Sequence, residues 1–100
     1  DNTVASNTEI INNICLPEKV PVIAGEEGIC EGCGVATLSI NYYDIGYKAG
    51  EMAYDILVNG ADITNMAIES APQVTKKYVA SRCEELNVTV PDGYEAIEAE

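Results

Sequence analysis

Four cysteines are the sharpest candidates for chemistry in this chain. Cys30 and Cys33 form a Cys-x-x-Cys motif, which is typical of a redox pair or of half a metal site. Cys15 and Cys83 could complete a four-thiolate zinc site. However, there is no second Cys-x-x-Cys and no histidine, and a redox motif normally precedes a helix, whereas here a strand is predicted after Cys33. Incidental thiols or a local disulfide are therefore the simplest interpretation, and a redox or zinc module stays as the alternative.

Polar and aromatic side chains follow two apolar runs that are predicted to be strands. Glu26 and Glu27 follow residues 20–24, and Asn41 and Tyr42 follow residues 35–40. In α/β folds, ligands sit in the crevice outside the carboxyl ends of such strands. Neighbours on an extended segment point to opposite sides, so only one of the two glutamates is expected to face a shared site. The sequence predicts a ligand-binding edge and not an enzyme, because no histidine, nucleophile elbow or phosphate loop is present.

The spacing of apolar residues predicts the elements that position these side chains. A first helix capped by Asn2 or Thr3 is expected to end at Pro17, and the glycine-rich stretch 25–34 to be a loop. The other expected elements are strands at 20–24, 35–40, 66–69 and 74–79, helices at 43–59 and 81–86, and an acidic tail at 94–100 with one or two helical turns. Alternating helices and strands indicate an α/β fold. Three or four strands would leave one face poorly covered, so we expect part of a larger unit.

The predicted helix 43–59 is the longest regular element. It carries an apolar stripe and is expected to be closed by Gly60, while Gly46 and Gly50 would allow close approach of a neighbour. The stripe consists of Ile45, Ala49, Met52, Ala53, Ile56 and Leu57. Because the natural partner of this stripe is not apparent, we expect the chain to dimerise, to swap elements or to stay bound to the rest of its parent.

Composition limits the class of partner. The chain has 100 residues, is 47% hydrophobic and carries a net charge of −12. Binding to nucleic acids or to anionic membrane surfaces requires clustered lysine and arginine, so the charge argues against both as partners, and no nucleic acid is expected. The apolar content is sufficient for a packed core, so the chain is not expected to be disordered.

Several blocks of sequence together resemble one family. Residues 1–6 (DNTVAS), 21–28 (PVIAGEEG), 36–46 (ATLSINYYDIG) and 87–91 (NVTVP) are similar to the C-terminal part of ABC-transporter substrate-binding proteins of the tryptophan/tyrosine-uptake type. The resemblance implies a partial type I periplasmic-binding-protein fold, in which two lobes joined by three hinge crossings close on a small solute. It also implies an extracellular lipoprotein or periplasmic protein that delivers a solute, such as an aromatic amino acid, to ABC permease subunits without a cofactor.

The resemblance implies a division of the chain and a set of ligand contacts. Residues 1–40 would belong to the C-terminal lobe, 41–65 to a crossing and a helix mainly of the N-terminal lobe, and 66–100 to the returning strands and a cover. The expected ligand-binding residues are Asp1, Asn2, Glu26, Glu27, Asn41 and Tyr42. Two features depart from the family pattern. Asn41 stands where an aspartate is common, and an amide cannot pair with a substrate ammonium as a full charge does. The motif Cys30-Glu-Gly-Cys33 has no expected counterpart.

Overall fold

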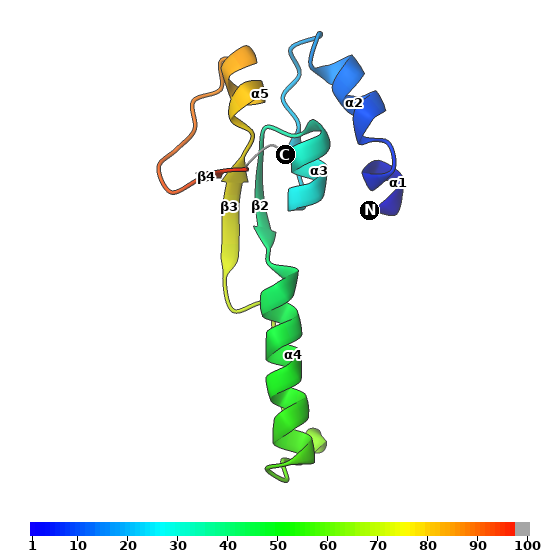
Figure 1. Ribbon diagram of the computed structural model, residues 1–100, viewed down its shortest axis with the longest axis vertical. Coiled ribbons are helices and arrows are strands. Elements are labelled where there is room, and N and C mark those ends of the chain that lie inside the picture. Colours follow the sequence, from blue (N-terminus) through cyan, green and yellow to red (C-terminus); the bar gives the residue numbers. More distant parts are fainter. Residues whose placement is uncertain (98–100) are drawn as a thin grey trace. The chain divides into compact units, whose positions relative to one another are not determined.

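The computed structural model describes residues 1–97 and divides into two compact units. Unit 1 comprises Asp1–Ser39 together with Thr75–Glu100, of which residues up to 97 are described, and unit 2 comprises Ile40–Val74. The chain therefore leaves unit 1 after Ser39 and returns at Thr75 (Figure 1).

Four strands form a mixed sheet in the order β1-β2-β3-β4. The strands are β1 (Ile23–Ala24), β2 (Ala36–Ile40), β3 (Val74–Tyr78) and β4 (Glu95–Ala96). β1 pairs with β2 in parallel, and β3 pairs with β4 in parallel. β2 and β3 run in opposite directions, since the Val79 N–H donates to the Val35 carbonyl at one end and the Ser39 and Thr75 hydroxyls meet at the other (Figure 1). The α/β class is confirmed, and the antiparallel pair arises because β2 carries the chain out of unit 1 and β3 brings it back.

The first helical region is broken in two, which the sequence did not predict. α1 (Asn2–Ala5) is followed by α2 (Thr8–Cys15), and the cap of α1 is Asp1 rather than Asn2 or Thr3. At the break, the Asn7 side-chain amide donates to the Thr3 carbonyl over 2.7 Å, while the Asn7 backbone N–H donates to the Val4 carbonyl over 2.9 Å. The side chain thus takes the acceptor that a continuing helix would give to the backbone.

The expected loop at residues 25–34 is wrong, because a helix occupies most of it. α3 (Glu27–Cys33) is capped by Glu26, whose carboxylate accepts hydrogen bonds from the backbone N–H groups of Gly28 and Ile29. α3 buries Ile29, Cys30 and Cys33, and this apolar face offsets the low helix propensity of its glycines.

In residues 66–97, two of the expected elements are wrong and two are confirmed. Residues 66–69 form no strand, and β4 stands where helical turns were predicted in the tail, whose residues 98–100 lie outside the described part. β3 and α5 (Ala80–Glu85) confirm the predicted strand 74–79 and helix 81–86 with ends shifted by a residue.

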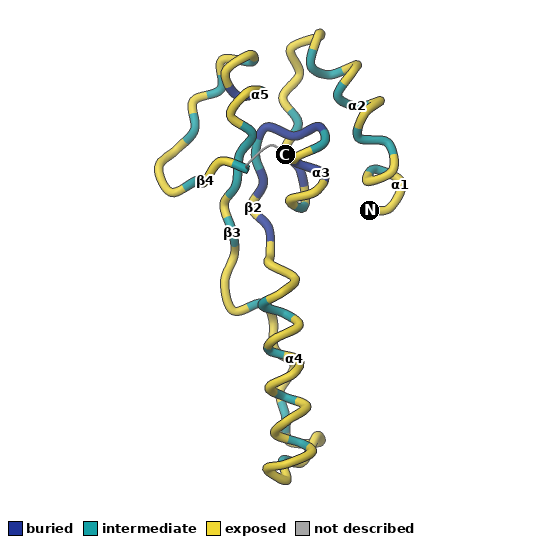
Figure 2. Tube along the Cα trace, in the orientation of Figure 1, coloured by how far each residue is buried: buried dark blue, intermediate teal, exposed yellow. Residues whose placement is uncertain are grey.

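Unit 2 consists of α4 (Tyr42–Leu57), the short 3₁₀ helix η1 (Ile63–Asn65) and extended connections. The predicted helix is confirmed, with Gly60 in the left-handed region (φ 72°) just beyond it. Ile45 and Met52 of the apolar stripe line a groove together with Glu69, and the Glu69 carboxylate pairs with Lys48 of α4 over 3.4 Å. The stripe is therefore partly covered within unit 2. No residue of α4 is fully buried (Figure 2), and β-carbons at Gly46 and Gly50 would meet nothing, so the close neighbour expected there is absent from the described residues.

The core lies in unit 1. Its buried centre is formed by Ala24, Ile29, Cys30 and Cys33, with Val4, Ile11, Val22, Val79 and Ile97 packed around it. Figure 2 shows the buried segments concentrated on α3 and the start of β2. Among residues 1–97, none of the helices has both the length and the apolar character needed to cross a bilayer.

Candidate functional site

The two glutamates predicted at a strand end have different roles in unit 1. Glu26 is extended (φ −157°, ψ 168°), and its carboxylate is occupied with the first N–H groups of α3. Glu27 is the first residue of α3 and is exposed. The pair is therefore not an extended segment with alternating sides, as expected, but a cap followed by a helical residue. Glu27 is the carboxylate that is not engaged in capping the helix.

Asp1 and Asn2 lie at the start of α1. The Asp1 carboxylate accepts a hydrogen bond from the Val4 N–H over 2.9 Å, and both residues are exposed. α1 contacts α3. Unit 1 thus brings into contact the two helices that carry Asp1, Asn2 and Glu27.

Asn41 and Tyr42 belong to unit 2 and stand at the start of α4. Asn41 Oδ1 accepts a hydrogen bond from the Tyr43 N–H over 2.8 Å and caps the helix, and the Tyr42 side chain is 66% exposed. The six predicted ligand contacts are therefore divided four to two between the units. Three of them, Asp1, Glu26 and Asn41, act as helix caps in this structure, and a ligand role for any of the six stays a prediction.

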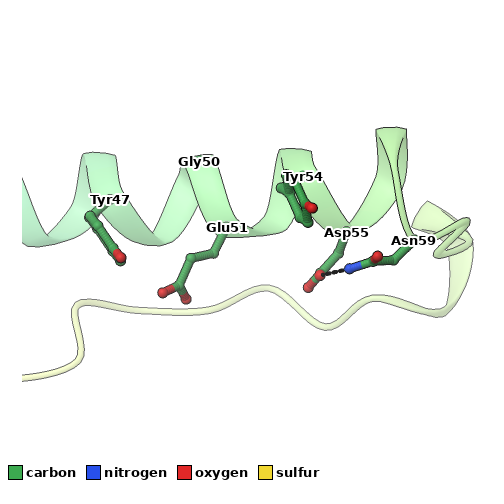
Figure 3. Close-up of a pocket in the computed structure, with 6 residues that line it drawn as sticks. All are labelled: Tyr47, Gly50, Glu51, Tyr54, Asp55 and Asn59. Carbon is green, nitrogen blue, oxygen red and sulfur yellow. Dashed lines mark hydrogen bonds between the residues drawn. The ribbon is translucent and has the colours of Figure 1, made fainter.

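A shallow groove of about 530 Å³ lies on α4, and the sequence reasoning missed it. It is lined by Tyr47, Gly50, Glu51, Tyr54, Asp55 and Asn59 (Figure 3). Asn59 donates to Asp55 over 3.0 Å at one end, and the Tyr47 ring stacks on Tyr43 beyond the other. The recurrence of tyrosine at 43, 47 and 54 is the signal that could have indicated this surface, which combines aromatic walls with acidic acceptors.

The cysteines are free thiols and are mostly buried. Cys30, Cys33 and Cys83 are buried, and Cys15 is half-buried. Cys33 donates weakly to the Ile29 carbonyl and Cys83 to the Val35 carbonyl, each at 3.4 Å. Burial raises the pKa of all three buried thiols, that of Cys30 to about 11, although nearby Arg82 lowers the pKa of Cys30 and Cys33. Neutral thiols are poor nucleophiles, so these residues pack as small apolar groups.

The alternative of a redox or zinc module is not supported by this arrangement. The Cys-x-x-Cys motif lies inside α3 and ends it, so the helix N-terminus that would activate a redox thiol is elsewhere. Within residues 1–97, no three side chains of cysteine, aspartate or glutamate gather in a way that could hold a metal ion.

The raised pKa of Cys30 makes stability depend on pH in the alkaline range. The unfolded thiol ionises near pH 9, whereas the buried thiol ionises near pH 11, so the unfolded state loses its proton first. The stabilisation is complete below pH 9 and is lost as the pH rises to 11, by about 2–3 kcal/mol. Denaturant unfolding at pH 8, 9, 10 and 11 measures this loss. Cys30→Ala should show a shallower decline, and parallel curves for the two proteins would contradict the prediction.

Arg82 of α5 makes five hydrogen bonds in unit 1, and the sequence analysis did not single it out. Its guanidinium joins α2, the C-terminal end of α3 and α5. The bonds are Nε to Asn12 Oδ1 (2.8 Å), Nη1 to the carbonyls of Cys30 (3.1 Å), Glu31 (2.8 Å) and Gly34 (3.3 Å), and Nη2 to the carbonyl of Gly32 (2.8 Å). A cation at the C-terminal end of a helix also interacts favourably with the helix dipole.

Comparison with solved structures finds the same fold in larger proteins. A substrate-binding protein with adhesive properties from Clostridium difficile, in a ligand-free, open state, is 32% identical with a TM-score of 0.82 over the whole chain, which covers 34% of that protein. A conserved domain protein from Vibrio cholerae is 24% identical (TM-score 0.76), with 97% of this chain and 34% of that one covered. An ABC domain in complex with L-Trp from Streptococcus pneumonia is 17% identical (TM-score 0.69), with 96% and 42% covered. The last two support the fold alone.

Comparison of sequences gives the family. A tyrosine-binding protein from Clostridioides difficile is 39% identical over 57 residues, which are 57% of this chain and 16% of that protein. The chain spans about a third of the length of the proteins from Clostridium difficile and Vibrio cholerae whose structures it matches. The family described as ABC transporter substrate binding protein matches residues 1–98. The chain belongs to the family of ABC transporter substrate-binding proteins.

Proposed function

We propose that this chain is the C-terminal part of the solute-binding component of an ABC importer, which captures an aromatic amino acid between two lobes. The observation that supports it most is the division into two units joined by two chain crossings, in a chain that the family matches over residues 1–98. A two-lobed binding protein needs such crossings, because closure around a ligand is a hinge motion between lobes. Unit 1 then belongs to the C-terminal lobe and unit 2 mainly to the N-terminal lobe.

The relatives favour an amino acid as the solute. The relative from Clostridioides difficile is named a tyrosine-binding protein, and the structure from Streptococcus holds L-Trp. The predicted contacts provide groups of suitable chemistry. The exposed Glu27 carboxylate is suited to a ligand ammonium, the Asn41 amide to a ligand carboxylate, and the exposed Tyr42 ring to an aromatic face.

The other partners follow from the same proposal. Permease subunits of the membrane would read the closed state, and the protein would work outside the cytoplasmic membrane, held there by a lipid anchor or free in the periplasm. The 100-residue chain alone would bind ligand weakly, because most of one lobe is missing, and would dimerise, swap elements or associate with the rest of its parent. Large exposed apolar side chains, such as Ile23 (73% exposed) on β1 and Leu57 (83% exposed) on α4, support the last statement.

Calorimetric titration of the full-length natural protein with L-tyrosine, L-tryptophan and L-phenylalanine tests the proposal. We expect saturable one-to-one binding of at least one of the three. Glu27→Gln should weaken it about tenfold or more, because a charge-assisted hydrogen bond is lost. Glu31→Gln removes the same charge from the exposed side of the same helix and should leave affinity within about twofold. Absence of binding for all three amino acids would refute the proposed solute class, and equal effects of the two variants would refute the role of Glu27.

A further inference from the structure

Two hydroxyl groups meet where the chain passes between the units. Ser39 is the last residue of unit 1 before the chain leaves, and Thr75 is the first after it returns. They are 36 residues apart in sequence, yet Ser39 Oγ lies 3.2 Å from Thr75 Oγ1. The contact belongs to unit 1 and stands at its boundary on both crossings.

The geometry allows a pair of hydrogen bonds between the crossings. Thr75 Oγ1 donates to the Ser39 carbonyl over 3.4 Å, which leaves Thr75 Oγ1 free to accept the Ser39 hydroxyl proton. Ser39 is only 5% exposed. Because a buried hydroxyl without a partner is costly, the Ser39 side chain depends on Thr75, which is itself half-buried.

Packing alone does not explain hydroxyls at this position. The burial of β2 alternates, and its buried positions are Thr37 and Ser39, while Leu38 and Ile40 are more exposed. Thr37 donates to the Ala24 carbonyl over 2.8 Å, so its bond ties β2 to β1 within the body of unit 1. The Ser39 bond instead ties one crossing to the other. The two hydroxyls of β2 thus make a similar bond with different consequences, which provides a matched comparison.

We propose that the Ser39–Thr75 pair is a positioning device that keeps the two crossings in register at the hinge. This inference rests on the proposed function. Hinge motion is absorbed by a few residues at the ends of elements. With Ser39 and Thr75 linked, β2 and β3 act as one body up to the boundary, and bending is confined to Ile40 and Val74 beyond it. Without the link, only backbone pairing holds the ends of the two strands together, the ligand-free protein samples more arrangements at this point, and closure costs more conformational entropy.

The test uses the full-length natural protein and the variants Ser39→Ala, Thr75→Val, Thr75→Ser and Thr37→Val. Hydrogen exchange measures the protection of the backbone amides in β2 and β3 without ligand. Calorimetric titration measures the affinity for whichever of L-tyrosine, L-tryptophan and L-phenylalanine the natural protein binds. Ser39→Ala and Thr75→Val should speed amide exchange in β3 about tenfold and weaken binding about threefold to tenfold, the range expected for one lost hydrogen bond. Thr75→Ser keeps the hydroxyl and should behave as the natural protein does. Thr37→Val should lower the melting temperature but leave β3 exchange and affinity unchanged.

The possible failures are distinguishable. Loss of affinity in Thr37→Val equal to that in Ser39→Ala would overturn the inference, since any lost bond in β2 would then suffice. Unchanged β3 exchange in Ser39→Ala would also overturn it. If the natural protein binds none of the amino acids, the proposed solute class fails, while exchange in β3, which needs no ligand, still decides the role of the pair.

Discussion

Replacing Arg82 by alanine lowers the free energy of unfolding by about 3 kcal/mol, because several neutral oxygens lose the one charged donor that they share. The guanidinium donates to four backbone carbonyls around the end of α3 and to the Asn12 side chain. Alanine leaves these acceptors without their charged donor in a partly buried place, and hydrogen bonds to charged groups are worth about 1.5–3 kcal/mol each, though not additively. Chemical denaturation of the natural protein and of Arg82→Ala measures the difference.

Arg82→Lys separates charge from geometry. Lysine keeps the positive charge near the C-terminal end of α3, but it cannot direct donors to oxygens on two sides as a planar guanidinium does. We therefore expect Arg82→Lys to retain less than half of the free energy of unfolding that Arg82→Ala loses. Lys19→Ala is the matched control, because Lys19 donates to a single carbonyl, that of Glu85, at 3.4 Å. Its effect should be below about 0.5 kcal/mol. Full rescue by lysine would show that the dipole interaction dominates.

Local sequence patterns predicted two of the main elements. β2 was predictable from the apolar run at residues 35–40, whereas the run at 20–24 forms a strand only at Ile23–Ala24. α4 was predictable from the spacing of Ile45, Met52 and Ile56, because a helical stripe recurs whatever it packs against. α3 was not predictable, since it contains Gly28 and Gly32 and is stabilised by the Glu26 cap and by distant Arg82. Such contacts, 50 residues apart in sequence for Gly32 and Arg82, leave no periodic signal.

The candidate site residues were likewise predictable only in part from the sequence. The strand-end rule led to Glu26 and Asn41, but only Asn41 was expected at the start of a helix, and the rule could not separate capping from ligand contact. Both functions require an oxygen at the same corner of the fold. The cysteine motif was ambiguous for a different reason. Whether Cys30 is reactive depends on burial by residues from other elements, and burial is a tertiary property.

Gly32→Val should destabilise the protein by about 3–4 kcal/mol, at or above the upper end of the usual cost of overpacking. A β-carbon at Gly32 would lie 2.5 Å from Thr8 Oγ1 and 2.6 Å from Thr8 Cβ. The second atom is fixed to the backbone of α2, so rotation of the Thr8 side chain cannot relieve the contact. α2 and α3 must then separate, although a glycine inside a helix ordinarily costs about 1 kcal/mol and replacing it would be expected to help.

Two further variants test whether the close approach of α2 to α3 is the cause. In the Thr8→Ala background, the loss of Thr8 Oγ1 and its methyl group should recover about half of the destabilisation, because the Thr8 β-carbon remains in place. Gly25→Ala is the control, since a β-carbon at Gly25 meets nothing within 4 Å, and its effect should stay within about 0.5 kcal/mol.

Gly46→Ala lies on the exposed face of α4, where a β-carbon also meets nothing, and should stabilise the helix by about 0.5–1 kcal/mol. If Gly46→Ala instead destabilises the full-length protein, a neighbouring segment approaches α4 closely at that position. That result would identify the covered face of the helix and support its place in the second lobe.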